Sequence, residues 1–456
     1  MPNFNEIPAL TPALLQATLA LGYDTMTPIQ AAALPLLLAG VDLQAQARTG
    51  SGKTAAFGLA LLARLQTSSA RLQAAVLCPT RELAEQVAQE LRALARFIPN
   101  LKIISLCGGI PLKLQLASLK HEPQIVTGTP GRLLALLRLG ELRVDALATV
   151  VLDEADRMLD MGFLDEVAAI LEFMPQNRAT WLFSATYPRE IHQLGARFQR
   201  APQIVKVEEE AAQGAIEQHY YQVEAAAKPA AMVALLRQHQ AESCLIFCNT
   251  RNDVREVCAH LWANKIAALA LHGELEQRER EATLVQFANG SARVMVATDV
   301  AARGLDIEAL PLVLAYELPN DADVHVHRIG RTGRAGMSGV ALALVAPAEL
   351  PRFDRIARMQ APSPALQALP KTQAAPLPPP AMATIAFDAG RQDKLRPGDI
   401  VGALTGSGIL RFEQIGKIDV FATRAYVAVE RAVIGEVVAS LRAAKIKGRK
   451  VRLHAL

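Results

Sequence analysis

The sequence has few of the features that extracellular, metal-binding or membrane-embedded proteins need. Its five cysteines include no Cys-x-x-Cys pair and no matched histidine spacing, and most lie in apolar runs such as Cys244–Cys248. Buried thiols are therefore favoured over disulfides, and no structural metal is expected. The longest apolar stretch, residues 31–41, is too short to span a bilayer. Because no leader pattern is visible either, a cytoplasmic protein without membrane contact is expected.

Aromatic residues and net charge are also low. Only 5% of the residues are aromatic, which disfavours a protein that binds single strands by stacking successive bases. The formal net charge is +4, but residues 382–456 carry 13 Lys and Arg against 7 Asp and Glu. The basic charge is therefore concentrated in the tail. Such a patch predicts an anionic partner, most often nucleic acid.

The length and the segment pattern predict a chain of several domains. At 456 residues, with 51% hydrophobic residues, the chain is globular and long enough for two or three domains. Strand-like and helix-like segments alternate over residues 30–200 and again over 244–345, with a looser stretch at 201–215. This alternation predicts an α/β fold with two doubly wound parallel sheets.

A glycine-rich segment follows an early strand-like run and precedes a helix-like run: Ala47-Arg48-Thr49-Gly50-Ser51-Gly52-Lys53-Thr54. Gly50 and Gly52 let backbone N–H groups curl around phosphates. Lys53 adds a charge against the β- and γ-phosphates, and the Thr54 hydroxyl is placed to ligate Mg²⁺. The segment predicts a P-loop, although Ala47 stands where glycine is usual and a plain glycine-rich turn is the alternative.

A hydrophobic run farther along the chain ends in carboxylates, within Thr149-Val150-Val151-Leu152-Asp153-Glu154-Ala155-Asp156. A parallel sheet would deliver Asp153 and Glu154 to its carboxyl edge, where ligands bind. Asp153 can hold Mg²⁺, directly or through water, and Glu154 can orient or deprotonate the attacking water. The pair alone could be an acidic helix start. Together with the preceding P-loop it predicts hydrolysis of a nucleoside triphosphate.

The second alternating run has no P-loop, but it contains arginines that suit a phosphate. Arg331 and Arg334 are three residues apart in His327-Arg328-Ile329-Gly330-Arg331-Thr332-Gly333-Arg334. On a helix both would share one face, where they could stabilise charge on a transferred phosphoryl group. The alternative is a surface basic cluster or an RNA-phosphate contact, particularly for Arg328.

The ordered motifs of about the first 345 residues resemble those of the DEAD-box family of ATP-dependent RNA helicases. The matching residues are Gly22, Thr27-Pro28-Ile29-Gln30, 47–54, Pro79-Thr80-Arg81-Glu82-Leu83, Gly108-Gly109, Thr129-Pro130-Gly131-Arg132, 153–156, Ser184-Ala185-Thr186, 297–306 and 327–334. The resemblance also accounts for Ala47, because the phosphate loop of this family normally starts with alanine. It implies two tandem RecA-like domains, at residues 1–205 and 216–360, with a Q motif at 2–30.

The resemblance implies how ATP is bound. Tyr23 would stack on adenine with support from Phe4, and Gln30 would pair with the adenine edge, so ATP is expected over GTP. Residues 47–54 would hold the phosphates. Gly304 and Asp306 would meet the phosphates and the ribose when the two domains close.

The resemblance also implies an RNA path. Ser184 and Thr186 would couple the carboxylates at 153–156 to RNA. The residues that would line the path are Thr80, Arg81, Gly109, Thr129, Gly131 and Arg132 in the first domain and Thr250, Gly273, Gln277, Arg280 and Thr298 in the second. Apart from the arginines, these are small polar residues and glycines, which suit phosphates and 2′-hydroxyls.

The last hundred residues differ in composition. Residues 361–381 are rich in proline and predict an extended tether. Residues 382–456 follow a βαββαβ pattern, the layout of an RNA-recognition motif, with a small module for dimerisation or partner binding as the alternative. Only Tyr426 occupies an expected aromatic position on the 425–429 strand, so base stacking across this sheet is not expected.

The tail resembles the C-terminal RNA-binding domain of a bacterial branch of the same family. The matching segments are 396–406, Ile415-Gly416-Lys417-Ile418, Tyr426-Val427-Ala428-Val429 and Lys445-Ile446-Lys447-Gly448. The implied target is a hairpin of 23S ribosomal RNA, and the implied process is large-subunit assembly. Basic edges and loops are expected to hold the hairpin by its shape, through Lys417, Arg424, Lys445, Lys447, Arg449 and Lys450.

The sequence therefore predicts a monomeric RNA helicase that uses ATP and Mg²⁺ and is directed to a large-subunit precursor by its tail. One alternative is an ATP-gated RNA clamp or scaffold with little unwinding, which Glu154 and the Arg331/Arg334 pair disfavour. Another is a DNA translocase, which Gln30 and the acidic motif disfavour.

Overall fold

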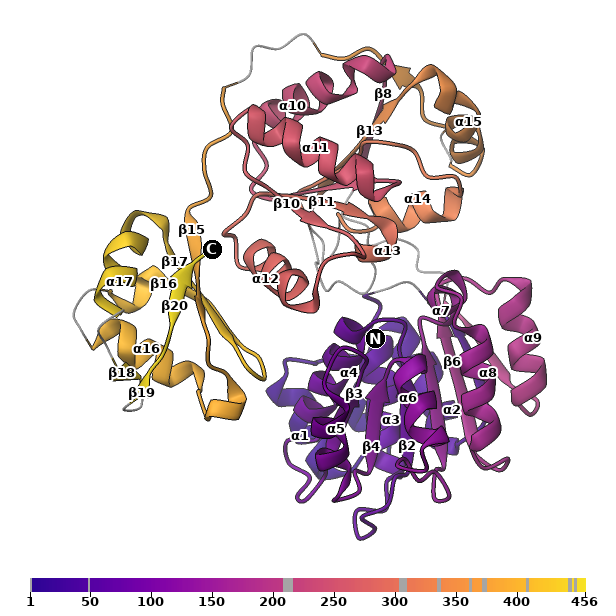
Figure 1. The fold of residues 1–456 in the computed structure, drawn as a ribbon. Coiled ribbons are helices and arrows are strands. Elements are labelled where there is room, and N and C mark those ends of the chain that lie inside the picture. Colours follow the sequence, from indigo (N-terminus) through magenta and orange to yellow (C-terminus); the bar gives the residue numbers. More distant parts are fainter. Residues whose placement is uncertain are drawn as a thin grey trace. The chain divides into compact units, whose positions relative to one another are not determined.

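The computed structural model describes residues 2–47, 50–207, 216–302, 310–333, 338–360, 363–370, 375–406, 410–441, 445–446 and 449–456. The chain folds as two compact units that are divided in the sequence between Glu210 and Ala211 (Figure 1). Among the described residues, no helix combines the length and apolar character needed to cross a membrane.

The first unit is a seven-stranded parallel sheet in the order β3-β4-β2-β5-β6-β1-β7. The strands are β1 Leu43–Gln46, β2 Ala74–Leu77, β3 Ile103–Leu106, β4 Ile125–Gly128, β5 Thr149–Asp153, β6 Ala179–Ser184 and β7 Gln203–Lys206. The helices are α1 Pro12–Ala20, α2 Pro28–Ala39, α3 Lys53–Arg64, α4 Arg81–Leu94, α5 Leu112–Leu119, α6 Pro130–Arg138, α7 Ala155–Asp160, α8 Leu164–Phe173 and α9 Arg189–Phe198.

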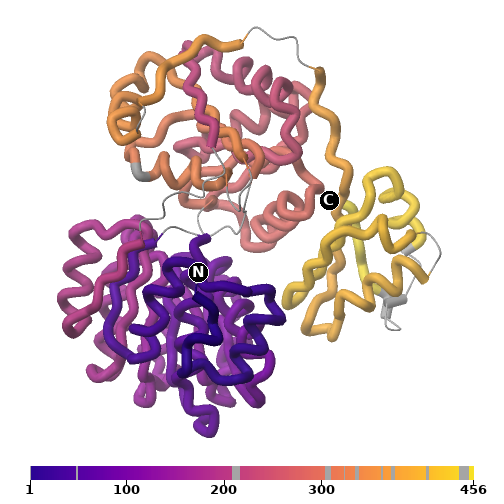
Figure 2. Tube along the Cα trace, turned by 180° about the vertical axis from the view of Figure 1, so that it is seen from behind, coloured from indigo at the N-terminus to yellow at the C-terminus, as the bar shows by residue number. Residues whose placement is uncertain are grey.

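Helices cover both faces of this sheet, as Figures 1 and 2 show from opposite sides. On β5, Val151 packs into the core beneath α2, α3 and α4, whereas Val150 and Leu152 pack into the core beneath α6 and α8. This alternation follows from the period of two in a strand. Because both faces are buried, the strand carries the apolar run Val150–Leu152 directly before Asp153.

The second unit contains another parallel sheet, in the order β10-β11-β9-β12-β13-β8-β14. The strands are β8 Ile216–Gln222, β9 Cys244–Cys248, β10 Ala268–Leu271, β11 Val294–Thr298, β12 Leu312–Ala315, β13 Gly339–Val345 and β14 Leu366–Gln367. The helices are α10 Lys228–His239, α11 Arg251–Ala263, α12 Gln277–Ala288, α13 Asp299–Ala302, α14 Ala322–Ile329 and α15 Leu350–Arg358. The two predicted doubly wound sheets are confirmed.

Two segments that were expected to lack regular structure contain strands. The edge strand β7 lies within the stretch at 201–215 that was expected to be loose, and β14 lies within the proline-rich segment. β14 pairs in parallel with β8, and Leu369 and Leu377 pack against the second core. The extended tether predicted for residues 361–381 thus packs against the second unit at Leu366–Gln367, Leu369 and Leu377. Edge strands tolerate nearby prolines, and the interspersed leucines supply apolar burial.

The C-terminal part of the second unit has the predicted βαββαβ order. Its elements are β15 Met382–Phe387, α16 Pro397–Thr405, β16 Ile415–Val420, β17 Ala425–Glu430, α17 Ile434–Leu441 and β20 Leu453–Ala455, with a short pair of strands, β18 Lys445–Ile446 and β19 Arg449–Lys450. The four-stranded antiparallel sheet has the order β16-β17-β15-β20. One face packs on α16 and α17 through residues such as Ile385, Phe387 and Val427.

The other face of the tail sheet contacts α12. Val285 of α12 packs with Ala386 and Tyr426, whose side chains lie on that face. Beside them, the Thr384 hydroxyl donates to Ser291 Oγ at 2.8 Å, and Asn289 Nδ2 donates to Thr384 Oγ1 at 2.9 Å. A protein helix therefore occupies the sheet face on which RNA-recognition motifs commonly stack bases.

Tyr426 illustrates how closely the two surfaces meet. Its side chain is fully buried and packs edge-on against Phe421 at a centroid distance of 5.7 Å. Burial raises the pKa of Tyr426 to about 12, and the negative charge of Glu281 on α12 contributes to the rise. The single aromatic of the 425–429 strand thus serves the contact with α12.

Replacing Tyr426 by alanine should destabilise the tail. Removing a buried aromatic side chain typically costs about 3–5 kcal/mol. We expect the denaturant midpoint of the tail transition, followed by circular dichroism, to fall accordingly. Phe412→Ala is the matched control, because Phe412 is 68% exposed and its loss should change the unfolding free energy by less than about 0.5 kcal/mol. Equal effects of the two substitutions would contradict the packing described here.

Candidate functional site

The carboxyl edge of the first sheet gathers the residues predicted to bind ATP and RNA. Parallel strands end at the same edge, where ligands of α/β proteins bind. The P-loop follows β1 and the acidic motif follows β5, with β6 between them. Thr80, Gly109 and Thr129 follow β2, β3 and β4, which are the remaining neighbours on the other side of β5. One half of the edge therefore collects the predicted phosphate-binding residues and the other half the predicted RNA-binding residues.

The phosphate loop has the backbone that its sequence predicts. Gly50 and Gly52 have φ values of 83° and 90°, and α3 begins at Lys53. A Cβ on Gly52 would lie 2.5 Å from Gln30 Nε2, so a side chain would not fit there. Buried Lys53 donates from Nζ to the Ala47 carbonyl at 2.8 Å. The predicted contributors Arg48 and Thr49 lie outside the described residues, and Ser51 and Thr54 complete the loop.

The Q-motif residues support this loop directly. The Thr27 hydroxyl donates to the Ser51 carbonyl at 2.8 Å, and Gln30 Nε2 donates to the Gly52 carbonyl at 3.1 Å. Gln30 Oε1 accepts from the Thr27 N–H at 2.9 Å. Gln30 was predicted to pair with adenine, and no role was predicted for Thr27. The missed signal is a Thr-x-x-Gln capping box at the start of α2.

The two aromatic residues of the predicted adenine site pack against the first core. Phe4 is buried in the first core, and Tyr23 packs partly buried against the same core. Burial and the negative charge of Glu90 raise the pKa of Tyr23, so the phenol stays neutral. Phe4 and Tyr23 thus pack against the core that α2 also joins, and contacts of Phe4, Tyr23 and Gln30 with adenine stay a prediction.

Asp153 and Glu154 are buried with oxygens that lack partners. Asp153 Oδ1 and Glu154 Oε2 have no hydrogen-bond partner among the described residues. Arg157 Nε lies 3.4 Å from Glu154 Oε2, an ion pair without hydrogen-bond geometry. Burial raises the pKa of Asp153 to about 7, which the positive charge of Lys53 opposes and the charge of Glu154 reinforces. Buried carboxylate oxygens without a hydrogen-bond partner suit a cation or a polarised water.

Glu154 also has an unusual backbone. Its φ is +54°, in the left-handed region that non-glycine residues rarely adopt, and it stands directly before α7. Such strain often occurs at functional positions, where the surrounding structure holds it in place. The left-handed conformation of Glu154 directs the chain from β5 into α7 and leaves the Asp153 and Glu154 carboxylates at the carboxyl edge of the sheet.

Asp156 connects the acidic motif to β6. Its N–H donates to Ser184 Oγ at 3.1 Å. Its Oδ2 accepts from the Thr186 N–H at 2.9 Å and from the Thr186 hydroxyl at 3.0 Å. Burial would raise the pKa of Asp156, but the hydrogen bonds from Thr186 and Ser184 and the charge of Lys53 lower it overall. The predicted coupling residues Ser184 and Thr186 therefore contact the acidic motif.

The predicted RNA residues of the first unit lie at helix N-termini. Thr80 caps α4, where its Oγ1 accepts from the Leu83 N–H at 3.2 Å, and Thr129 caps α6. Gly109 has a φ of 77°, and a side chain there would collide with the Arg81 guanidinium.

The first turn of α6 contributes two more predicted RNA residues. The space where a Cβ of Gly131 would lie is open, whereas Arg132 Nη1 donates to Gln115 Oε1 at 2.6 Å. Exposed N–H groups beside small residues suit the phosphates of a nucleic acid.

The second sheet has an analogous edge. Thr250, Gly273 and Thr298 lie at the carboxyl ends of β9, β10 and β11, which are neighbours in the sheet. Gln277 and Arg280 lie on the first turns of α12, and Arg280 Nη2 donates to the Ala301 carbonyl at 2.8 Å. The structure therefore brings these predicted RNA residues together within the second unit.

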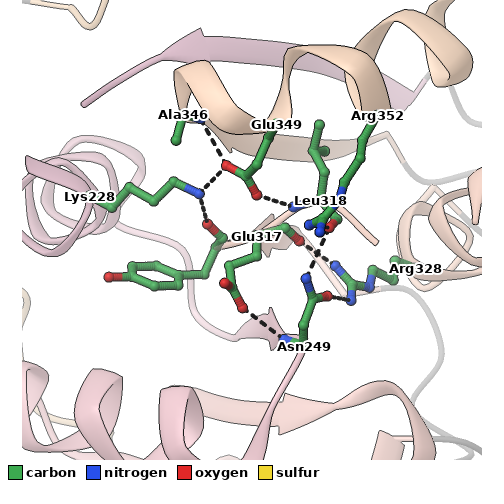
Figure 3. A network of polar contacts seen from close by, with 9 residues as sticks. Lys228, Asn249, Glu317, Leu318, Arg328, Ala346, Glu349 and Arg352 are labelled. Atoms are coloured by element: carbon green, nitrogen blue, oxygen red, sulfur yellow. Dashed lines mark hydrogen bonds and ion pairs between the residues drawn. The ribbon is translucent and has the colours of Figure 1, made fainter. Parts of the chain in front are cut away.

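The arginines of the 327–334 motif take different positions. Arg331 follows α14 and is buried, and Arg334 lies outside the described residues, as do Gly304 and Asp306. Arg328 is 2% exposed, and its hydrogen bonds to Asp299, Asn249 and Glu317 lie within the second unit. Figure 3 shows those to Asn249 and Glu317. The structure therefore offers no support for Arg328 as part of a surface basic cluster.

The basic residues of the tail are only partly described. Lys417 is exposed, with Nζ 3.7 Å from Asp419 Oδ1. Arg424 is mostly buried, and its Nη2 donates to Asp388 Oδ1 at 2.8 Å. Lys445 lies on β18, and Arg449 and Lys450 lie on β19, without described side chains. Lys447 lies outside the described residues.

Family comparisons cover all three parts of the chain. Residues 27–194 match the DEAD/DEAH box helicase family, and residues 227–336 match the helicase conserved C-terminal domain. Residues 384–455 match the DbpA RNA binding domain.

Individual proteins are similar over most or all of the chain. The ATP-dependent RNA helicase DbpA of Escherichia coli is 51% identical over the full length of both chains. The DEAD-box ATP-dependent RNA helicase CshA of Geobacillus kaustophilus is 40% identical over 78% of this chain and 76% of its own. Among solved structures, S. cerevisiae Dbp5 bound to RNA and ADP BeF3 has a TM-score of 0.74 at 29% identity, covering 81% of this chain and 96% of its own.

The buried carboxylate of Glu154, whose Oε2 has no hydrogen-bond partner, gives a direct prediction. Glu154→Gln keeps the shape of the side chain but removes its ability to take a proton from water. We expect ATP and RNA to bind with affinities near those of the unchanged protein, while ATP turnover falls by about 10²–10⁴-fold. Phosphate release would measure turnover, and fluorescent nucleotide titration would measure binding. Glu141→Gln, at an exposed position, is the control, and unchanged turnover in Glu154→Gln would refute the assigned role.

Proposed function

The chain belongs to the DEAD-box family of ATP-dependent RNA helicases, and we propose that it remodels 23S ribosomal RNA during assembly of the large ribosomal subunit. One observation carries this proposal: the basic tail matches a DbpA RNA binding domain over almost its whole length. A helicase core that grips RNA without reading sequence needs such an attachment to choose its substrate.

ATP would bind at the edge formed by β1, β6 and β5 together with Mg²⁺. The orphaned Asp153 oxygen and the Thr54 hydroxyl are the hard oxygen ligands that this ion prefers. Once bound, Mg²⁺ would neutralise charge on the β- and γ-phosphates. Lys53 would leave the Ala47 carbonyl to contact a phosphate, and Glu154 would hold and deprotonate the attacking water. Tyr23 and Gln30 would select adenine.

RNA would contact the edges of both sheets through phosphates and 2′-hydroxyls. Arg331 and Arg334 would meet the γ-phosphate when ATP and RNA draw the two units together, and Gly304 and Asp306 would join them. Asp156 and its contacts with Ser184 and Thr186 would carry the state of the phosphate site towards RNA. Closure that bends one strand would separate a short duplex, and hydrolysis would release it.

The tail would hold a hairpin of 23S ribosomal RNA by its edges and loops. Contact with α12 covers the face that carries Tyr426, which supports attachment through basic residues outside that face. Lys417 and the lysines of the β18–β19 hairpin are candidates. The protein would act as a monomer in the cytoplasm, where ribosomal precursors are assembled.

The decisive experiment compares ATP turnover with three RNAs: a 23S ribosomal fragment containing the hairpin, the same fragment without it, and unrelated RNA. We expect half-maximal stimulation at a concentration at least about tenfold lower with the complete fragment. Equal stimulation by all three RNAs would refute the proposed target. ATP-dependent RNA binding without turnover would favour an RNA clamp instead.

The tail lysines can be tested together. Replacing Lys445, Lys447 and Lys450 by alanine should weaken binding of the hairpin and lower its log–log salt slope by about two to three. Filter binding at several salt concentrations measures both quantities. The control replaces three exposed basic residues outside the tail, Lys120, Arg138 and Lys265. An unchanged affinity and salt slope in the lysine variant would place the RNA elsewhere on the tail.

A further inference from the structure

Arg328 is a buried cation at the carboxyl edge of the second sheet. Its Nε and Nη2 donate to the two carboxylate oxygens of Asp299, each at 2.7 Å. Nη2 also donates to Asn249 Oδ1 at 2.8 Å, and Nη1 donates to the Glu317 carbonyl at 2.5 Å. The guanidinium carbon lies 5.2 Å from the ring centroid of Phe247. One side chain thus satisfies acceptors that follow β11, β9 and β12. Figure 3 shows the contacts of Arg328 with Asn249 and Glu317.

The residues that Arg328 contacts adjoin the predicted RNA residues. Asn249 precedes Thr250, the cap of α11, and Asp299 follows Thr298, the last residue of β11. The Arg331 N–H donates to the Arg328 carbonyl at 3.2 Å, so the predicted phosphate-binding arginine continues from the same turn. We call the contacts of Arg328 with Asp299, Asn249 and Glu317 the Arg328 clamp. Both predicted RNA threonines and the predicted phosphate-binding arginine are one to three residues away from it in the sequence.

The clamp needs arginine rather than any positive charge. A planar guanidinium can pair with a carboxylate through two parallel hydrogen bonds and still donate sideways, whereas a lysine ammonium cannot reproduce that fork. The Arg328 side chain is 1% exposed and that of Asp299 is 22% exposed, so neither solvent nor salt screens the pair strongly. We therefore expect the buried, hydrogen-bonded Arg328 and Asp299 side chains to move as one unit.

Asn249 extends the clamp into a wider network. Its N–H donates to Glu317 Oε2 at 3.0 Å, and its Nδ2 donates to the Leu318 carbonyl at 3.0 Å. Glu349 accepts from the Leu318 N–H at 3.0 Å and forms a second buried ion pair with Lys228 (Figure 3). This second pair has a similar chemistry, but its contacts reach Asn249 through Leu318 rather than through Arg328, which makes it a natural control.

We propose that Arg328 is a positioning residue that couples RNA binding to the γ-phosphate arginines. RNA held at Thr250 and Thr298 would fix the ends of β9 and β11, and the bidentate clamp would pass that position to the turn that carries Arg331. Arg328 itself contacts neither RNA nor nucleotide. This inference rests on the proposed function, because it takes the RNA-binding and phosphate-binding roles of those residues from it.

The test measures thermodynamic coupling rather than activity alone. The affinity of the full chain for single-stranded RNA is measured with and without a non-hydrolysable ATP analogue, and the ratio of the two values is the coupling factor. In Arg328→Lys we expect RNA affinity without nucleotide to stay within about twofold, while the coupling factor falls at least about tenfold. Asp299→Asn, which keeps the arginine, should show the same loss if Arg328→Lys fails to fold. The double variant should be no worse than either single one.

Glu349→Gln is the matched control, because it removes the charge of the other buried pair. It should lower the thermal unfolding midpoint but keep the coupling factor. Loss of coupling in this variant as large as that in Arg328→Lys would overturn the proposal, as would a destabilised Arg328→Lys with normal coupling. A fall in nucleotide-free RNA affinity with a smaller salt slope would show direct RNA contact and would also overturn it. Absence of coupling in the unchanged protein would instead refute the proposed function.

Discussion

Both helicase sheets depend on one constraint, which is that all their strands run in the same direction. The chain must return through a helix after each strand, and the carboxyl ends collect at one edge. Strand order, rather than distance in the sequence, then decides which side chains meet. Because β6 pairs with both β1 and β5, Ser184 lies between the phosphate loop and the acidic motif. The hydrogen bonds between Asp156 and Thr186 follow from this placement.

The carboxyl edges of the two sheets differ in whether their buried charged groups have hydrogen-bond partners. In the first unit, Asp153 and Glu154 each keep a buried oxygen without a hydrogen-bond partner, and Glu154 has a strained backbone. Each such feature costs about 1–3 kcal/mol, which the apolar cores on both faces of the sheet must offset. In the second unit, Arg328 has carboxylate, amide and carbonyl acceptors. The two carboxylates lie where a ligand is expected to supply the missing hydrogen-bond partner, whereas Arg328 joins loops that follow three neighbouring strands.

Local sequence patterns predicted most of the fold, because apolar periodicity and turn residues act over short distances. The alternation of strands and helices expected over residues 30–200 and 244–345 coincides with the elements of the two parallel sheets, and the apolar run Cys244–Cys248 is β9. Features that depend on distant pairing could not be read in this way. β14 is two residues long and exists only because β8 offers an open edge, and the surface against which Tyr426 packs lies on a helix far earlier in the chain. The burial of Arg328 could not be predicted from local sequence patterns either, because its hydrogen-bond acceptors follow three separate strands.

The contact between α12 and the tail limits how freely this tail could be exchanged between proteins. A tail expressed alone or fused to an unrelated enzyme would present Ala386 and Tyr426 to water without Val285 to cover them. Exposed apolar surface on a small sheet favours self-association. Moving the tail to another protein would therefore require α12, or another apolar surface in its place, to move with it.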